Sequence, residues 1–300
     1  MRVATRGSPL ARHQAGLVAD RLTGAGANAP GHVDVQQVVV ETTGDRVADA
    51  PIWQLGGQGV FVKEVQAAVL DGRADIAVHS AKDLPSSTAP GLVLAAVLER
   101  ADPRDALVGA TLVGLQVGGR VATGSVRRRA QLAWLRPDLT FVGLRGNIDT
   151  RLAQVSQFDA LVMAAAALQR LGREDMITEY LDPVSMVPQV GQGALAVECR
   201  EGDEVSLRAL AAIEHPTSRL AVDAERAFLA EIGGGCDRPV GAFATVAPGG
   251  LLTLTGMVAT ADGRIVLRHQ DSGDDGPALG RRVARYLLDD SGGAKLLEVG

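Results

Sequence analysis

Short strand-like runs alternate with helical patterns through the first two thirds of the chain, and this alternation constrains the fold most strongly. Arg2–Thr5 and Val33–Glu41 are typical of strands, whereas Pro9–Leu22 between them carries an apolar stripe of helical period. Strands that alternate with helices predict a mostly parallel sheet with helices on both faces. The pattern resumes after Glu99–Ala106, a charged, turn-rich segment that we expect to be a crossover into a second α/β unit.

The pattern changes at Pro216. A helical stripe over Thr217–Ile232 ends at three consecutive glycines, and three β-type runs separated by glycine-rich turns follow it. A last helical stripe lies at Pro277–Leu288. The sequence therefore predicts two α/β lobes and a small C-terminal α+β domain with an antiparallel sheet.

Composition excludes several classes of protein. Hydrophobic residues make up 46% of the 300, yet no apolar run approaches the ~20 residues of a membrane span. The first residues, MRVATRGSPLAR, lack the apolar stretch of a signal peptide, and two cysteines make no disulfide framework. A formal net charge of −5 argues against a general nucleic-acid binder. We therefore expect a reduced cytoplasmic protein that binds neither nucleic acid nor membrane.

The segment VATGSVRRRAQLAWLRP indicates an anion site. A strand runs into Thr123 and Ser125, and a helix then begins with Arg127, Arg128 and Arg129. Free N–H groups at a helix start bind anions, and cations in the first turn oppose the helix dipole unless an anion lies there. The alternative is a solvated first turn with a serine cap.

Two further strand-to-helix turns carry similar residues. FVGLRGNIDTRLAQV places Arg145 before a tight turn at Asn147 and Arg151 one helical turn later, while Arg6 and Ser8 follow the first strand. Arginine forks suit carboxylates and phosphates equally well. Open α/β sheets bind ligands at the carboxyl ends of their strands, so we expect all three turns to meet one anionic ligand.

The segment ADIAVHSAKDLPSS ends a strand with Ser80, Lys82 and Asp83. One interpretation is a surface ion pair of little energetic importance. The other is a carboxylate that stabilises a cation or handles a proton in an arginine-lined crevice. We expect His79 to be structural.

Neither cysteine nor any histidine has metal-ligand spacing, so we expect no metal site. Cys199 lies in an extended segment that is expected to return to the first sheet as a buried strand, whereas Cys236 follows three glycines. Gly56–Gly59 lacks the Walker pattern, and the run Thr42–Gly59 better suits a flexible lid over a cleft.

Seven segments in order resemble the porphobilinogen deaminase (hydroxymethylbilane synthase) family: RGSPLA, GGQGVFVKE, ADIAVHSAKDLP, TGSVRRRAQL, LRGNIDTRL, VGQGALAVE and GGGCDRPVGAFA. The resemblance spans nearly the whole chain. It implies two lobes like those of type II periplasmic binding proteins and a third domain that carries the cysteine. The implied domains are 1–98 with 190–212, 99–189, and 216–300.

The resemblance also implies a function in tetrapyrrole (haem-type) biosynthesis. Family members join four porphobilinogen molecules head to tail into hydroxymethylbilane and release ammonia from each. A dipyrromethane cofactor, which the enzyme makes itself and holds through a thioether to the residue matched by Cys236, primes the reaction. A thiolate is a strong nucleophile suited to such an attachment. Each ring carries an acetate and a propionate, which explains an arginine-lined cleft in an acidic protein.

Individual residues carry over by position. Asp83 matches the catalytic carboxylate, which binds pyrrole N–H groups and stabilises a cationic intermediate. The implied cofactor-binding residues are Ser80, Lys82, Asp83, Thr123, Ser125, Arg127, Arg128 and Arg145, with Cys236 as the covalent attachment. The implied substrate-binding residues are Arg6, Ser8, Arg145, Asn147, Arg151 and Gln192. Gln58 and Gly124 depart from the family, which commonly has lysine and serine at these positions.

Two other functions compete with this one. A non-enzymatic, two-lobed anion-binding protein explains the arginine turns but leaves Cys236 without a role. A cysteine acyl-transfer enzyme needs a histidine partner, for which His215 and His269 are isolated candidates. The deaminase reading implies a monomer whose partner is the small molecule porphobilinogen.

Overall fold

The computed structural model describes residues 1–26, 34–42, 59, 62–233 and 238–298. The chain divides into two compact units, one made of Met1–Ala101 with Ala194–Arg219 and the other of Asp102–Gly193 with Leu220–Gly300. Cys236, Gln58 and most of the segment expected to form a lid lie outside the described residues.

The first unit is built on a five-stranded sheet in the order β2-β1-β3-β10-β4. Its strands are β1 (Arg2–Arg6), β2 (Gln36–Val40), β3 (Ile76–Ser80), β4 (Leu92–Val97) and β10 (Leu195–Arg200). β1 pairs in parallel with both β2 and β3, whereas β10 runs antiparallel between β3 and β4. The predicted return of the later segment to this sheet is confirmed, and the sheet is parallel apart from that strand.

Helices cover both faces of this sheet, as the alternation predicted. They are α1 (Pro9–Gly26), α3 (Lys63–Leu70) and α7 (Glu204–Ala211). Successive strand residues point to opposite faces, so Val3 packs with α1 and α7 residues such as Val18 and Leu210, while Ala4 packs with α3 residues such as Val65. Cys199 is buried in the first of these two clusters, as expected.

The second unit contains a further five-stranded sheet in the order β7-β6-β8-β5-β9. Its strands are β5 (Asp105–Val108), β6 (Arg120–Ala122), β7 (Thr140–Val142), β8 (Ala160–Ala164) and β9 (Glu179–Leu181), and its helices are α4 (Val126–Leu135), α5 (Ile148–Leu152) and α6 (Ala165–Arg170). β6 is parallel to β7 and β8, and β5 is antiparallel to β8 and β9. The expected crossover at Glu99–Ala106 is wrong at its end, because Asp105 already begins β5.

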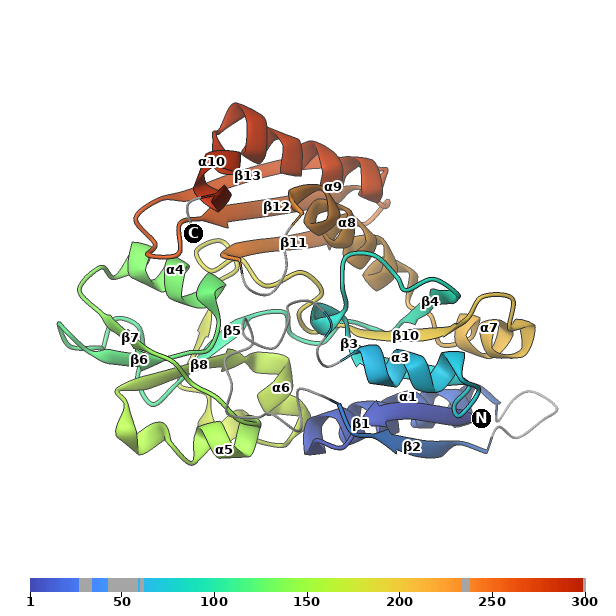
Figure 1. The fold of residues 1–300 in the computed structure, drawn as a ribbon. Coiled ribbons are helices and arrows are strands. Elements are labelled where there is room, and N and C mark those ends of the chain that lie inside the picture. Colours follow the sequence, from blue (N-terminus) through green and yellow to red (C-terminus); the bar gives the residue numbers. More distant parts are fainter. Residues whose placement is uncertain (27–33, 43–58, 60–61, 234–237, 299–300) are drawn as a thin grey trace. The chain divides into compact units, whose positions relative to one another are not determined.

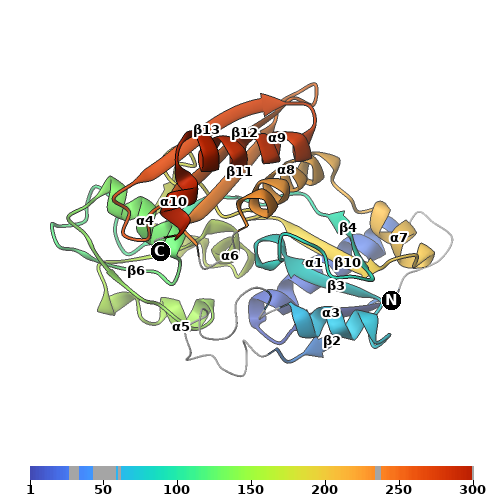
Figure 2. The same cartoon turned by 45° about the horizontal axis from the view of Figure 1, so that its top comes forward.

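The same unit continues into a three-stranded antiparallel sheet, β11-β12-β13. Its elements are α8 (Pro216–Ile232), β11 (Val240–Val246), β12 (Leu252–Ala259), β13 (Val266–Gly273), α9 (Gly276–Arg285) and α10 (Gly293–Glu298). α8 and α9 lie together over one face of this sheet, where Phe228, Leu254 and Val283 share a core (Figures 1 and 2). Gly280 permits their close approach, since a Cβ there would lie 2.2 Å from the Ala224 carbonyl oxygen.

A buried carboxylate joins the α/β part of the second unit to its C-terminal sheet. Glu225 on α8 accepts hydrogen bonds from the Gly191 N–H at 2.7 Å and the Ala244 N–H at 2.8 Å. The predicted α/β and α+β architecture is therefore confirmed. The boundaries of three separate domains stay a prediction, since residues 102–193 and 220–300 form one compact unit here.

No helix in the described part of the chain is long and apolar enough to cross a membrane.

Candidate functional site

One edge of the first sheet gathers several of the predicted site residues. β1 and β3 are parallel neighbours, so the residues that follow them lie at the same edge. Arg6 ends β1, and Ser8 precedes α1 and accepts a hydrogen bond from the Ala11 N–H at 3.3 Å. Ser80 ends β3, and a 3₁₀ turn, Ala81–Asp83, follows at once. This edge therefore presents hydroxyl, cationic and carboxylate groups together.

The Asp83 side chain provides the carboxylate at this edge. Its side chain is half-buried, and its carboxylate has no hydrogen-bond or ion-pair partner in the part of the chain that the structure describes. Arg6 and Lys82, by contrast, have interaction partners of their own. A partly desolvated carboxylate without a protein partner is available to accept from a ligand N–H or to face a cation.

His79 lies in the strand that leads to this edge but belongs to the interior. Its Nε2 is 3.2 Å from Glu198 Oε2, without hydrogen-bond geometry, and Gln66 donates to the same oxygen at 2.8 Å. All three side chains are buried. This placement agrees with the structural role that we expected for His79.

The carboxyl edge of the second sheet has its own cluster. Thr123 and Ser125 follow β6, and Ser125 caps α4 by accepting from the Arg128 N–H at 3.4 Å. Asp105 reaches the same edge from the other direction, because β5 is antiparallel to β8 and pairs Asp105 with Ala164, the last residue of β8. Residues from three strands therefore meet around the start of α4.

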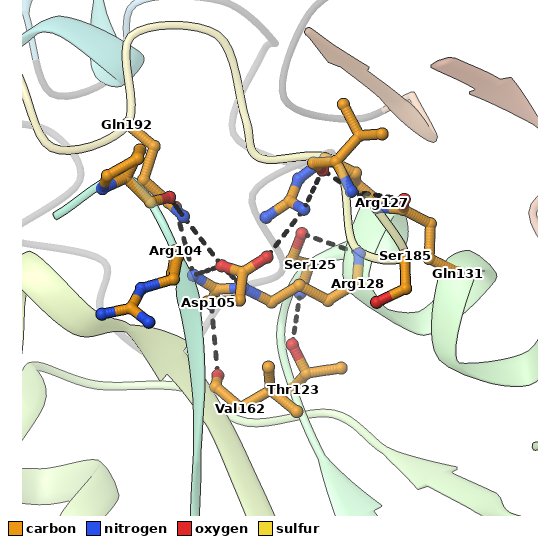
Figure 3. Close-up of polar contacts among 12 residues, drawn as sticks. Arg104, Asp105, Thr123, Ser125, Arg127, Arg128, Gln131, Val162, Ser185 and Gln192 are labelled. Atoms are coloured by element: carbon orange, nitrogen blue, oxygen red, sulfur yellow. Dashed lines mark hydrogen bonds and ion pairs between the residues drawn. The ribbon is translucent and has the colours of Figure 1, made fainter. Parts of the chain in front are cut away.

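Asp105 is the centre of this cluster (Figure 3). Its Oδ2 accepts from Arg127 Nη1 at 2.8 Å, and its Oδ1 accepts from Arg128 Nε and from Gln192 Nε2, both at 2.9 Å. Burial alone raises the pKa of Asp105, but the two guanidinium groups and the hydrogen bonds from Arg127 and Gln192 outweigh it and hold the pKa well below its usual range. The carboxylate is thus ionised although it is fully buried.

Further hydrogen bonds fix both arginines. Arg127 Nη1 donates to the Val187 carbonyl at 2.7 Å. Arg128 Nη1 donates to the Val162 carbonyl at 3.2 Å, and its Nη2 donates to Gln192 Oε1 at 3.3 Å. Gln192 also donates to the Pro103 carbonyl at 2.7 Å.

Arg127 retains donors that nothing in the described part of the chain accepts. Its Nε and Nη2 are buried without a hydrogen-bond partner there, and its side chain is only 3% exposed. Two arginines and one aspartate leave this buried cluster with one net positive charge. Buried hydrogen-bond donors are almost always satisfied, so these two nitrogens require an acceptor. A ligand carboxylate has the charge and the paired oxygens that suit them.

These contacts correct one interpretation of the arginine-rich turn. A solvated first turn is wrong for Arg127 and Arg128, which are 2% and 6% exposed, and applies only to Arg129. The serine cap is present, and the anion that the structure shows beside the arginines is the protein's own Asp105. Sequence reasoning missed this residue because a segment of proline, arginine and aspartate was interpreted as a turn.

The turn after β7 is shaped by its own residues. Gly146 adopts φ +98°, a left-handed conformation that favours glycine, and its carbonyl accepts from Arg151 Nε at 2.8 Å. Asn147 caps α5 by accepting from the N–H and the hydroxyl of Thr150, both at 2.9 Å. Asn147 therefore shapes the start of α5, while its contact with substrate stays a prediction.

Gly124, a departure from the family pattern, has a local reason in this chain. A Cβ at this position would lie 2.7 Å from the carbonyl oxygen of Leu144, so the turn after β6 packs too closely against the end of β7 for a side chain.

The two cysteines differ in what the structure says of them. Burial raises the pKa of the Cys199 thiol to about 11, so this thiol is protonated at neutral pH. Cys236 lies outside the described residues. Within residues 1–26, 34–42, 59, 62–233 and 238–298, no group of three histidine, cysteine or carboxylate side chains is placed to hold a metal ion.

Comparisons with known proteins agree with one another. Residues 1–208 match the family model described as "Porphobilinogen deaminase, dipyromethane cofactor binding domain", and residues 219–289 match "Porphobilinogen deaminase, C-terminal domain". The chain is 49% identical over 301 residues to a porphobilinogen deaminase of Roseiflexus castenholzii, which covers 98% of this chain and 97% of that protein. It is 43% identical over 303 residues to a porphobilinogen deaminase of Brevibacillus brevis, covering 99% and 97%.

A solved structure, a periplasmic His/Glu/Gln/Arg/opine family-binding protein from Silicibacter pomeroyi, is similar over 71% of this chain and 88% of that chain, with 15% sequence identity and a TM-score of 0.38.

The ionised state of Asp105 predicts a pH-dependent effect on stability. Asp105→Asn removes the charge opposite two buried guanidinium groups and is expected to lower the free energy of unfolding by about 3 kcal/mol at neutral pH. The folded-state pKa lies below the unfolded value, so the carboxylate stabilises the protein above about pH 4, and this contribution is lost as pH falls through the folded pKa. Urea unfolding of both proteins followed by circular dichroism should therefore give a difference that is constant above about pH 5 and narrows below about pH 4. A difference that grows on acidification would contradict the assignment.

Proposed function

Since the chain belongs to the porphobilinogen deaminase family, we propose that Asp83, Cys236 and an arginine set led by Arg127 carry out the activity of that family. The activity is the joining of four porphobilinogen molecules into hydroxymethylbilane with release of ammonia, primed by a dipyrromethane cofactor. The observation that supports this assignment most strongly is the buried, positively charged cluster in which Arg127 keeps two donors without a partner among the described residues.

The residues present fit an acidic pyrrole ligand. Each pyrrole ring carries an acetate and a propionate, and the cluster around Arg127 has the net charge and the donors that one carboxylate requires. When bound, the dipyrromethane supplies the free pyrrole carbon at which the chain is extended. Arg127 and the N-terminus of α4, with Thr123 and Ser125, would hold its carboxylates.

The attachment belongs at Cys236. A thioether forms from a nucleophilic thiolate, and the raised pKa and full burial of Cys199 disqualify that residue. Cys236 is the other cysteine of the chain, and its three preceding glycines allow a bulky adduct to approach the backbone.

Asp83 is the group that handles positive charge. Its half-buried carboxylate has no partner among the described residues, so it can accept from the pyrrole N–H groups of the substrate. When porphobilinogen loses ammonia, positive charge develops on its ring and exocyclic carbon. A fixed carboxylate nearby stabilises that charge more than water does, because it needs no reorganisation.

The remaining residues divide between ligand binding and support. We assign Ser80, Lys82, Arg128 and Arg145 to the cofactor, and Arg6, Ser8 and Arg151 to the substrate carboxylates. Asn147 and Gln192 act mainly as supports, because the side-chain carbonyl of Asn147 caps α5 and the side chain of Gln192 is bonded to Asp105, Arg128 and Pro103. The acidic net charge fits a monomeric cytoplasmic enzyme that binds neither nucleic acid nor membrane.

Intact-mass spectrometry tests the proposed function. The purified protein is expected to exceed the mass of its sequence by two linked pyrrole units and to give a colour with an aldehyde reagent for pyrroles. Cys236→Ser should remove the added mass and the activity, whereas Cys199→Ala should keep both. A wild-type protein that has only the mass of its amino acids yet polymerises porphobilinogen would refute the proposal.

Replacement of Asp83 tests the role of its carboxylate. Asp83→Asn keeps the size of the side chain and is expected to lower kcat by about a hundredfold or more, because it removes the charge that stabilises the cation. Asp75→Asn is the matched control, since Asp75 pairs with Arg2 just before the opposite end of β3. Steady-state kinetics on both variants measure this loss of kcat. A near-normal kcat in Asp83→Asn would rule out stabilisation of the cation by the Asp83 carboxylate.

A further inference from the structure

We propose that Asp105 is a positioning residue for the cofactor: it orients Arg127 and Arg128 so that the buried cluster accepts one carboxylate of the dipyrromethane. This inference rests on the proposed function and assigns Asp105 a part in it. Asp105 does not contact the ligand itself, because both of its oxygens are occupied by protein donors.

The topology brings Asp105 to this place. It is the first residue of β5, and its pairing with Ala164 sets it at the edge where the parallel strands β6 and β8 end. The helix α4 begins at that edge with the two arginines. A residue one strand position further along β5 would point to the opposite face of the sheet.

The contacts of Asp105 fix the orientation of Arg127. Arg127 Nη1 is held between Asp105 Oδ2 at 2.8 Å and the Val187 carbonyl at 2.7 Å. Because the guanidinium is planar and rigid, two acceptors on one terminal nitrogen also fix the directions of the other nitrogens. Nε and Nη2, which have no partner among the described residues, are therefore presented in a set direction.

The second oxygen of Asp105 organises the rest of the cluster. Oδ1 accepts from Arg128 Nε and Gln192 Nε2, and Arg128 Nη2 in turn donates to Gln192 Oε1. This set of contacts fixes Arg128 beside Asp105, although Arg127 and Arg128 both carry positive charge and are buried.

Charge balance gives Asp105 a second effect. With its carboxylate, the cluster keeps one net positive charge and suits one ligand carboxylate. Without it, two buried guanidinium groups would repel each other and turn toward solvent or toward other acceptors. The ligand carboxylate would then no longer be held in one orientation. A misplacement of the ligand by about 1 Å is enough to slow a reaction by about a hundredfold.

A second ion pair, at the C-terminal end of the same helix, provides a matched control. Arg136, at the other end of α4, donates from Nε and Nη2 to Asp138 at 2.8 and 2.6 Å. That pair is only partly buried and lies away from the edge where Ser125 caps the helix. Asp138→Asn therefore removes a two-point arginine contact from α4 without touching the cluster.

The test compares wild-type protein, Asp105→Asn and Asp138→Asn, purified in the same way. Intact mass gives the fraction of molecules that carry the cofactor. Incubation with excess porphobilinogen then gives the rate at which the cofactor-free fraction gains mass. We expect Asp105→Asn to load about ten- to hundredfold more slowly than wild type, and Asp138→Asn to load at the wild-type rate.

A double-mutant cycle separates positioning from a general loss of stability. If Asp105 acts through Arg127, then Asp105→Asn should slow loading little further in an Arg127→Gln background. Additive effects of the two substitutions, or wild-type loading in Asp105→Asn, would overturn the proposal. If Asp105→Asn does not fold, Asp105→Glu replaces it, because it keeps the charge but moves it by one methylene; wild-type loading in that variant would also overturn the proposal. A wild-type protein without any added mass would instead contradict the proposed function.

Discussion

The second unit depends on one buried carboxylate between two guanidinium groups. Asp105 is fully buried, and such a charge is stable only when it is paired and hydrogen-bonded, which Arg127, Arg128 and Gln192 provide. Asp105 and its partners come from a strand, a helix and a turn that are far apart in the sequence. The interaction therefore ties the fold of this unit to the proposed ligand site, because Arg127, which stabilises Asp105, also keeps two donors without a partner among the described residues.

The two five-stranded sheets present polar groups of opposite charge at the edges where their parallel strands end. In each, parallel strands end at one edge and the residues just after them carry the polar groups. The edge of the first sheet presents Asp83, a carboxylate without a protein partner among the described residues. The edge of the second presents Arg127, two of whose side-chain nitrogens have no hydrogen-bond partner among the described residues. In the proposed function, Asp83 stabilises the cationic intermediate and Arg127 binds a carboxylate of the cofactor.

Much of the fold follows from local sequence patterns. The run Arg2–Thr5, predicted as a strand, lies within β1, and Pro9–Leu22, predicted as a helix, lies within α1, because its apolar residues recur with helical period. β5 was missed, since it has four residues and begins with an aspartate that follows proline and arginine. The anion site at Arg127 was predicted, but its partner Asp105 was not. No local pattern links a charge to one 22 positions away, or Arg128 to Gln192, 64 positions away.

A crystal structure of the protein with its cofactor attached is the most direct test of the central claim. The account predicts a cofactor carboxylate oxygen within about 3 Å of Arg127 Nε or Nη2, with the contacts of Asp105 to both arginines intact. A structure in which those two nitrogens bond to protein or water, while every cofactor carboxylate lies elsewhere, would contradict it.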